Sequence, residues 1–357
     1  MTASALRALL AADRVTHVPG VYDPVTAALA VRAGHRAVHL SGAAVPATIP
    51  ARPDLGSVPA TQLADRASTL VPALDGVPLL ADADTGYSDP VHAVWTALAY
   101  SRSGISGLLL QDRAAPKRSG HPAAIGPAAA TITALAEQVP EMVVIAHTGA
   151  YPEFGIDETI LRCRAYAEAG ADAVFPEGIT TREDLRRLRA ALPGTPLVLS
   201  HSEATTRHTT PTTTQRTAPT DAEQAVPTDA DLAGPASAQR AAPITAHHAV
   251  PAAAHRTAPT AAHRTAATAA HRAAPTAAHR AVLTDADLAA VGVRLVLHPV
   301  SALLAAMRAA SLTYRAIADT GSAESVDRMP WAAFTDLIGQ DEALERDARY
   351  VPRNLHT

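Results

Sequence analysis

Aromatic residues, cysteine and long apolar runs are all scarce in this chain of 357 residues. Phe, Trp and Tyr make up only 3% of it, so a core must be built mainly from Ala, Val and Leu, which the hydrophobic share of 48% allows. The single cysteine, Cys163, excludes a disulfide framework within the chain and is typical of a reducing cytoplasm. No uncharged stretch reaches the length of a membrane span, and residues 4–14 lack the layout of a secretion signal.

A strong excess of charge of either sign is also lacking. The formal net charge is −4, which gives no electrostatic footprint for nucleic acid or for an anionic membrane. We therefore expect a cytoplasmic protein that binds neither nucleic acid nor a membrane.

Short apolar runs alternate with helical patterns along most of the chain. We expect strands at 15–18, 37–40, 79–81, 107–110, 143–147, 173–175, 197–200 and 295–298, with the Pro19-Gly20 pair breaking the chain after the first. We expect helices at 24–33, 60–74, 90–103, 156–169, 181–191 and 285–291, then at 301–318 and 330–350. This alternation favours a TIM-type (β/α)8 barrel with extra C-terminal helices. A doubly wound open sheet is the alternative, although such sheets usually have fewer strands.

Residues 204–282 depart from this pattern. They consist largely of Ala, Thr, Pro, His and Arg, with an Ala-His-Arg repeat of period eight at His255, His263, His271 and His279. Such a composition cannot bury enough apolar surface to fold alone. We expect a disordered insertion after strand seven, flanked by residues 1–203 and 283–357, which form the barrel and the C-terminal helices. The histidines could bind metal weakly or gain charge near pH 6, but we favour a repeat expansion without function.

Two carboxylates follow the third apolar run, in Leu79-Leu80-Ala81-Asp82-Ala83-Asp84-Thr85-Gly86. In an extended chain residues i and i+2 point to the same side, so Asp82 and Asp84 would project together at the strand end. Two like charges held this close repel each other, and a divalent cation between them removes the repulsion. A solvated turn is the alternative, since Asp, Thr and Gly are common turn residues.

Polar residues also follow the other expected strands. The functional groups of a barrel lie at the C-terminal ends of its strands, and here those ends carry Ser41, Gly42, Asp82, Asp84, Gln111, Asp112, His147, Thr148, Glu177, Ser200, His201 and His298. This convergence favours the metal interpretation of Asp82 and Asp84. The loop after strand four adds Lys117, Arg118, Ser119 and His121, which suit a loop over an anionic substrate; a solvated basic loop is the alternative.

Several motifs occur in a fixed order. They are Pro19-Gly20-Val21-Tyr22-Asp23, Leu40-Ser41-Gly42, Pro53-Asp54-Leu55-Gly56, Ala81-Asp82-Ala83-Asp84-Thr85-Gly86 and Lys117-Arg118-Ser119-Gly120-His121. In this order they resemble the isocitrate lyase and phosphoenolpyruvate mutase superfamily, with 2-methylisocitrate lyases and carboxyvinyl-carboxyphosphonate phosphorylmutases as the nearest groups. The resemblance resumes at residues 283–302. It implies a TIM-type barrel and a homo-oligomer, a dimer or a tetramer with exchanged C-terminal helices. It also implies Mg²⁺, or Mn²⁺, and a 2-oxo or 2-hydroxy carboxylate substrate in which a C–C or P–C bond is broken or formed.

The resemblance also assigns roles to individual residues. A metal site would comprise Asp54, Asp82, Asp84 and Gln111. Substrate binding would fall to Ser41, Gly42, Ala43, His147, Glu177 and Ser200. A catalytic loop would carry Lys117, Arg118, Ser119 and His121.

Four of these positions depart from the superfamily pattern. Ser119 stands where the lyases usually carry a cysteine that protonates the departing carbanion, and an alcohol is a much weaker acid than a thiol, whose reference pKa is about 8.5. Gln111 replaces a glutamate, which should weaken Mg²⁺ binding. His147 replaces an arginine that would clamp a carboxylate through two hydrogen bonds, and Ser200 replaces an asparagine.

These departures leave three functions open. One is a Mg²⁺-dependent carbon–carbon lyase similar to 2-methylisocitrate lyase, with an altered choice of substrate. Another is a catalytically impaired homologue that binds a metabolite or a partner. The third is a member of the superfamily that processes a phosphonate or oxaloacetate.

Overall fold

The computed structural model describes residues 2–87, 89–113, 121–179, 181–201 and 283–350. By contacts between Cα atoms the chain divides into one unit of residues 1–207 and 281–357 and a second unit of residues 208–280. The second unit lies outside the described residues. The insertion predicted at 204–282 and the three-part division of the chain therefore stay predictions.

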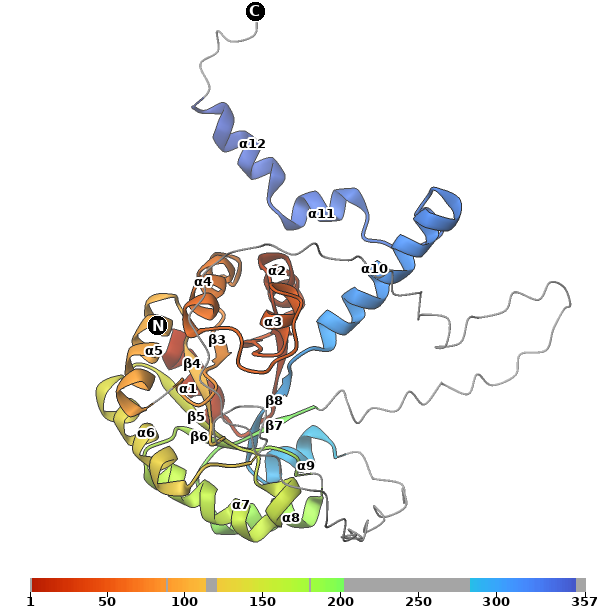
Figure 1. Cartoon of the computed structure of the whole chain (residues 1–357). Coiled ribbons are helices and arrows are strands. Elements are labelled where there is room, and N and C mark those ends of the chain that lie inside the picture. The colour runs from red at the N-terminus through yellow and green to blue at the C-terminus, as the bar shows by residue number, and fades with distance from the viewer. Residues whose placement is uncertain (1, 88, 114–120, 180, 202–282, 351–357) are drawn as a thin grey trace, which may run out of the picture. The chain divides into compact units, whose positions relative to one another are not determined.

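Eight parallel strands close into a barrel in the order of the sequence (Figure 1). They are β1 (Thr16–Val21), β2 (Val38–Leu40), β3 (Leu79–Asp82), β4 (Gly107–Gln111), β5 (Val143–Thr148), β6 (Ala173–Pro176), β7 (Leu197–Ser200) and β8 (Val293–His298). Strand β1 also pairs with β8, with Val18 opposite Leu297, and this pairing closes the barrel. The predicted TIM-type barrel is confirmed.

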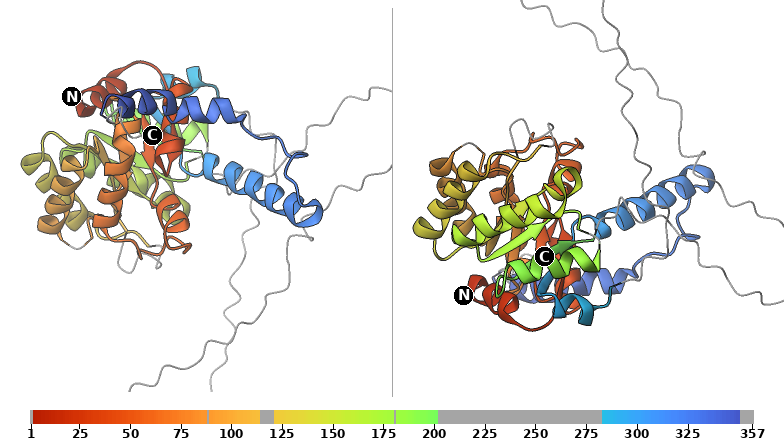
Figure 2. Two further views of the ribbon diagram at one scale, coloured as in Figure 1. Left: turned by 90° about the horizontal axis from the view of Figure 1, so that it is seen from above. Right: turned by 90° about the horizontal axis from the view of Figure 1, so that it is seen from below.

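Helices between the strands surround the barrel, and further helices follow β8 at the C-terminal end of the chain (Figure 2). They are α1 (Thr2–Ala11), α2 (Pro24–Arg32), α3 (Ala44–Thr48), α4 (Ala60–Leu70), α5 (Pro90–Arg102), α6 (Ile125–Gln138), α7 (Tyr151–Glu168), α8 (Arg182–Ala191), α9 (Asp285–Ala290), α10 (Ser301–Thr320), α11 (Trp331–Leu337) and α12 (Gln340–Ala348), with a 3₁₀ turn at Val71–Ala73. The extra C-terminal helices are present as predicted. Among the described residues, no helix combines the length and the apolar character that crossing a membrane requires.

Two expectations about chain breaks were wrong. Pro19-Gly20 lies inside β1 and does not end it. A Cβ at Gly20 would collide with the backbone of Pro299, so glycine allows β1 to approach the residue that follows β8. The helix expected at 330–350 is two helices, because Gly339 between them adopts a left-handed conformation with φ of 66°.

The apolar residues form two buried clusters. One lies between the strands and the surrounding helices. The other fills the barrel interior, where Leu6, Leu9 and Leu10 of α1 pack with inward-facing strand residues such as Leu80 and Leu109. Because side chains alternate along a strand, the next inward position after Leu80 is Asp82. The interior is therefore apolar in its depth and polar at the C-terminal ends of the strands.

Candidate active site at the C-terminal mouth of the barrel

Five of the predicted site residues face into the barrel at its C-terminal end. Each follows, by two positions, an apolar residue of the inner cluster, and this spacing keeps both on the inward side. The five are Asp82, Gln111, His147, Glu177 and Ser200, which follow Leu80, Leu109, Ile145, Phe175 and Val198. The structure thus brings together residues that are spread over more than a hundred positions of the chain.

Asp82 is the most constrained of these side chains. His39 Nε2 lies 3.1 Å from one carboxylate oxygen, and the backbone N–H of Gly42 donates to the other at 2.6 Å. Burial alone would raise the pKa of Asp82, but the charge and hydrogen bond of His39 and the N–H of Gly42 outweigh it. The pKa therefore lies below its usual value, and Asp82 is a carboxylate at neutral pH.

The turn after β2 is built around this carboxylate. A Cβ at Gly42 would lie 2.9 Å from the Asp82 oxygen, so only glycine lets the backbone approach so closely. The next N–H, of Ala43, donates to Ser41 Oγ at 3.1 Å. In this structure Gly42 and Ala43 thus donate to protein atoms, and the predicted binding of a substrate carboxylate by residues 41–43 stays a prediction.

The three predicted metal-binding aspartates line one small cavity. Its walls are formed by Gly42, Asp54, Gly56, Val58, Leu63, Asp82, Asp84 and Tyr87, and its volume is about 10 Å³. Asp84 has a left-handed backbone with φ of 45°, so the extended geometry we assumed for residues 82–84 ends at Asp82. The turn, and not strand alternation, brings Asp84 to the cavity.

Carboxylate and amide oxygens are donors that Mg²⁺ prefers, but a cavity of about 10 Å³ has room for about one water molecule, so a hydrated ion would have to widen it. Among the described residues, no group of three or more His, Cys, Asp or Glu side chains is arranged to hold a metal ion by itself. Mg²⁺ usually keeps several waters and takes only one or two carboxylates, so an incomplete protein shell does not exclude it. Close by on β4, the amide oxygen of Gln111 is buried and has no hydrogen-bond partner among the described residues. A buried acceptor without a partner is unusual in a folded protein, and a ligand or metal-bound water would satisfy it.

A second carboxylate and imidazole pair lies across the mouth. His147 Nε2 is 3.0 Å from Glu177 Oε2, and Arg113 Nη2 lies 3.9 Å from the same oxygen. The His147 ring stacks on Phe175, with 4.3 Å between the ring centroids. The hydrogen bond from His147 lowers the pKa of Glu177 below its usual value despite burial, and the charges of His147 and Arg113 lower it further.

Both histidines also carry a buried nitrogen. In the part of the chain that the structure describes, the Nδ1 atoms of His39 and His147 have no hydrogen-bond partner. Each Nε2 faces a carboxylate and donates to it, and the charge of the ring decides whether Nδ1 donates or accepts. Together with the Gln111 amide oxygen these nitrogens make three buried polar atoms without a partner among the described residues, which suits a polar ligand or water.

The predicted catalytic loop is described only at its edge. Lys117, Arg118 and Ser119 lie outside the described residues. His121 is described, and its Nδ1 lies 2.9 Å from Glu153 Oε1 in an exposed pair. Its catalytic role stays a prediction.

Two residues of the site were missed from the sequence. His39 lies in the apolar run 37–40, two positions before Ser41. A titratable side chain inside an apolar strand was the sequence signal that could have identified it. Arg113 follows Gln111 by two positions just beyond β4, so the same alternation could have placed it beside Glu177.

Known proteins share both the sequence pattern and the fold. Residues 6–217 match the family described as phosphoenolpyruvate phosphomutase. The 2-methylisocitrate lyase of Bacillus subtilis (strain 168) is 36% identical over 206 residues, which are 56% of this chain and 67% of the relative. The 2,3-dimethylmalate lyase of Eubacterium barkeri is 33% identical over 202 residues, which are 54% of this chain and 69% of the relative. A solved structure of phosphonopyruvate hydrolase with oxalate and Mg²⁺ superposes with a TM-score of 0.70 at 23% identity, over 99% of this chain and 100% of that one, which supports the fold alone.

The closed barrel with carboxylates at its C-terminal mouth defines the class, a (β/α)8-barrel enzyme. Within that class the chain belongs to the phosphoenolpyruvate phosphomutase family of the phosphoenolpyruvate mutase and isocitrate lyase superfamily. Relatives named lyases support the predicted enzyme class.

Proposed function

We propose that the protein is a Mg²⁺-dependent lyase that cleaves a carbon–carbon bond in a small 2-hydroxy or 2-oxo carboxylic acid. The observation that carries this proposal is the cavity lined by Asp54, Asp82 and Asp84, close to the unpartnered amide oxygen of Gln111. The names of the relatives from B. subtilis and E. barkeri, which state small carboxylic acids as substrates, support the substrate class.

The three aspartates and Gln111 would hold the ion, with water completing its shell. When bound, Mg²⁺, or Mn²⁺ in its place, supplies positive charge that stabilises an enolate formed by cleavage. Because Gln111 is neutral, we expect weaker metal binding than a carboxylate at that position would give.

The remaining roles fall to the chain's own side chains. His39 and the Gly42 N–H orient the Asp82 carboxylate. Glu177 fixes the His147 ring so that Nδ1 can accept a hydrogen bond from a substrate hydroxyl. Arg113, Lys117 and Arg118 supply positive charge for the carboxylates of the substrate. Ser119 would return a proton to the departing carbanion, and its high pKa as an alcohol predicts a slow step.

The test is a turnover panel with the purified full chain and Mg²⁺. Candidate acids are 2-methylisocitrate, 2,3-dimethylmalate and oxaloacetate, and the readout is pyruvate; phosphonopyruvate, with phosphate as a second readout, covers P–C cleavage. We expect pyruvate from at least one carbon acid, abolished by EDTA and by Asp82→Asn. The exposed variant Asp341→Asn on α12 is the matched control and should retain activity.

Three results would overturn the proposal in different ways. Calorimetric binding of Mg²⁺ and oxalate without turnover of any acid would support the catalytically impaired homologue. If neither Mg²⁺ nor oxalate binds, the proposed metal site itself is refuted. Release of phosphate from phosphonopyruvate alone would move the protein to P–C chemistry.

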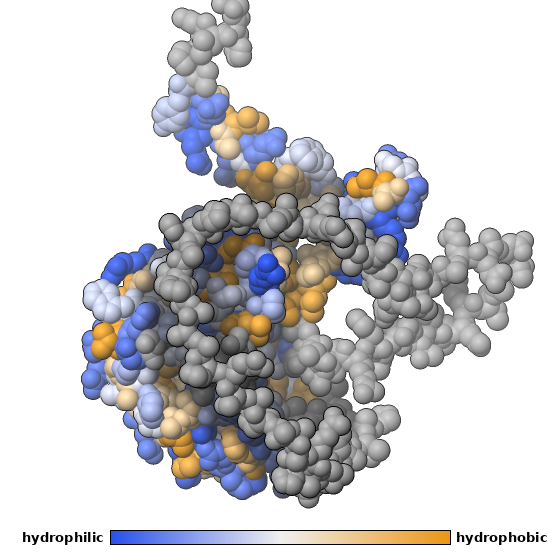
Figure 3. All heavy atoms as spheres, in the orientation of Figure 1, coloured by the Kyte–Doolittle hydropathy of each residue, from blue (hydrophilic) through white to orange (hydrophobic). Residues whose placement is uncertain are grey.

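We also infer that the protein is a homo-oligomer, a dimer or a tetramer. Helices α10 to α12 carry large apolar side chains on their surface (Figure 3), among them Met307, Tyr314 and Trp331, which are 58%, 72% and 73% exposed. Large exposed apolar side chains on three consecutive helices are typical of an interaction surface, and a second copy would cover them. Light scattering coupled to gel filtration measures the mass, and Trp331→Ser should lower it; a wild-type monomer would refute the inference.

A further inference from the structure

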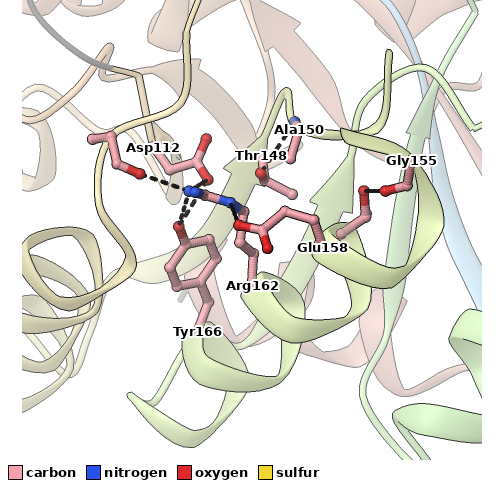
Figure 4. A network of polar contacts seen from close by, with 9 residues as sticks. Asp112, Thr148, Ala150, Gly155, Glu158, Arg162 and Tyr166 are labelled. Atoms are coloured by element: carbon pink, nitrogen blue, oxygen red, sulfur yellow. Dashed lines mark hydrogen bonds and ion pairs between the residues drawn. The ribbon is translucent and has the colours of Figure 1, made fainter. Parts of the chain in front are cut away.

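Arg162 of α7 is a buried arginine that the proposed chemistry does not use. Its side chain is 8% exposed, and it lies against Asp112, whose side chain is 3% exposed (Figure 4). Asp112 follows Gln111, so strand alternation turns it away from the barrel interior and toward α7. Burying two charges requires compensating contacts, and those contacts show what the pair holds in place.

One guanidinium contacts two separate stretches of the chain. Arg162 Nη1 donates to Asp112 Oδ2 at 2.9 Å and to the carbonyl oxygen of Ala123 at 2.7 Å. The Tyr166 hydroxyl donates to the same Asp112 oxygen at 2.7 Å, and Arg162 Nε donates to Glu158 at 2.9 Å. Asp112 precedes residues 114–120 and Ala123 follows them, so Arg162 joins the two stems of that segment.

The stems are also paired with each other and with the active-site strand. The N–H of Ala123 donates to the Asp112 carbonyl oxygen at 2.5 Å, and Arg113 forms an antiparallel bridge with Pro122. The N–H of Asp112 donates to the carbonyl oxygen of His147 at 2.9 Å. Arg162 therefore binds the chain just after β4, at Asp112, which lies between Gln111 and Arg113. Arg113 in turn lies near Glu177.

We propose that Arg162 is a positioning residue of the active site, which fixes the stems 112–113 and 122–123 relative to each other and to β5. Through Asp112 it sets the direction of Gln111 and Arg113, and it fixes the two points between which the chain carries Lys117, Arg118 and Ser119. Its effect on turnover depends on the proposed function. Its effect on the stems does not.

The direct test is limited trypsin digestion of the native full chain, followed by mass spectrometry. Arg162→Lys keeps the positive charge, but the shorter side chain does not reach the position from which Nη1 bonds both Asp112 and Ala123, and it lacks the Nε–H that donates to Glu158. We expect cleavage after Lys117 and Arg118 to become about tenfold faster, relative to cleavage after Arg256 in the same sample. Arg164→Lys is the matched control, since Arg164 lies on the same helix and, among the described residues, donates to the Ala191 carbonyl oxygen, away from Asp112.

A second variant covers the case in which Arg162→Lys does not fold. Tyr166→Phe removes one hydroxyl donor to Asp112 and leaves the guanidinium in place, so it should give a smaller increase at the same two bonds. Cleavage at Lys117 and Arg118 that is unchanged in both variants would overturn the proposal. A uniform increase at every site would also overturn it, because that result shows a role in global stability only.

Kinetics separate this proposal from the proposed function. For an acid that the wild type cleaves, Arg162→Lys should lower kcat by about tenfold or more, as loss of a residue that supports an active site usually does. The calorimetric affinity for Mg²⁺ should fall much less than kcat, because the contacts of Asp82 do not involve α7 and, of the proposed metal-binding residues, Gln111 alone lies on the strand that Arg162 positions. If no acid is cleaved, the proposed function fails while the digestion result still decides the role of Arg162.

Discussion

The substitution Gly42→Ala tests whether the turn after β2 holds Asp82. The new Cβ would lie 2.9 Å from the Asp82 oxygen and 3.2 Å from the Asp82 Cβ, so the carboxylate must move. The hydrogen bond from the Gly42 N–H would lengthen from 2.6 Å. A hydrogen bond to a charged group contributes about 1.5–3 kcal/mol, and overpacking costs about 1–3 kcal/mol. We expect a loss of about 2–4 kcal/mol in the free energy of unfolding, since partial relaxation makes the two effects less than additive.

Urea unfolding followed by circular dichroism at neutral pH measures this loss. Gly126→Ala is the matched control, because a Cβ there meets nothing within 4 Å and the residue lies in the first turn of α6. The control should be neutral or stabilised by about 0.5–1 kcal/mol. Displacement of Asp82 should also weaken Mg²⁺ binding in calorimetry. Equal urea midpoints for the two variants, with unchanged Mg²⁺ affinity, would refute the assigned role of Gly42.

Three further outcomes are expected. The pKa of Glu177 is lowered, so its hydrogen bond to His147 stabilises the folded state fully at pH values above the ordinary glutamate pKa of about 4.3. This stabilisation is lost as the pH falls through the lowered pKa of Glu177 in the folded protein. Because Glu177 is 47% exposed, we expect this contribution to the free energy of unfolding to be less than ~1 kcal/mol. The difference in free energy of unfolding between the wild type and His147→Phe should become smaller on acidification, and a difference that does not change with pH would contradict the prediction. Burial raises the pKa of Cys163, so Ellman's reagent should label the thiol only in denaturant, and rapid labelling of the native chain would refute its burial. Gly20→Ala should lower the melting temperature strongly, because its Cβ meets the Pro299 backbone, which cannot rotate away.

The barrel could be predicted because each strand contains a short apolar run and most helices show apolar residues at helical spacing. Errors arose where a residue has two structural uses. Gly126 and Pro127 indicate a loop, yet both lie in the first turn of α6, where proline needs no hydrogen-bond donor, and this helix was missed. Gly20 indicates a break, yet it serves a close approach between β1 and Pro299 that only the closed barrel creates.

The site could be predicted to the level of which residues meet, but not to the level of which atoms pair. Asp82, Gln111 and Glu177 follow from one rule about strand ends. The bond between His39 and Asp82 joins residues 43 positions apart, and that between Arg162 and Asp112 joins residues 50 positions apart. Such pairings depend on the register between strands and on the rotation of a helix, which local sequence does not encode.

The paired carboxylates show why metal binding and turnover should be measured separately. Asp82 and Glu177 each face an imidazole, so part of their negative charge is already balanced within the protein. A cation at Asp82 therefore competes with His39, and a substrate carboxylate near Glu177 meets His147 in place of a fixed guanidinium. In the mechanism that we propose, proton return by Ser119 is a third step, separate from these two. If Mg²⁺ binds and turnover is slow, Ser119→Cys should raise kcat without changing Mg²⁺ affinity, because a thiol is the stronger acid. An unchanged kcat in that variant would place the slow step at the altered clamp of His147.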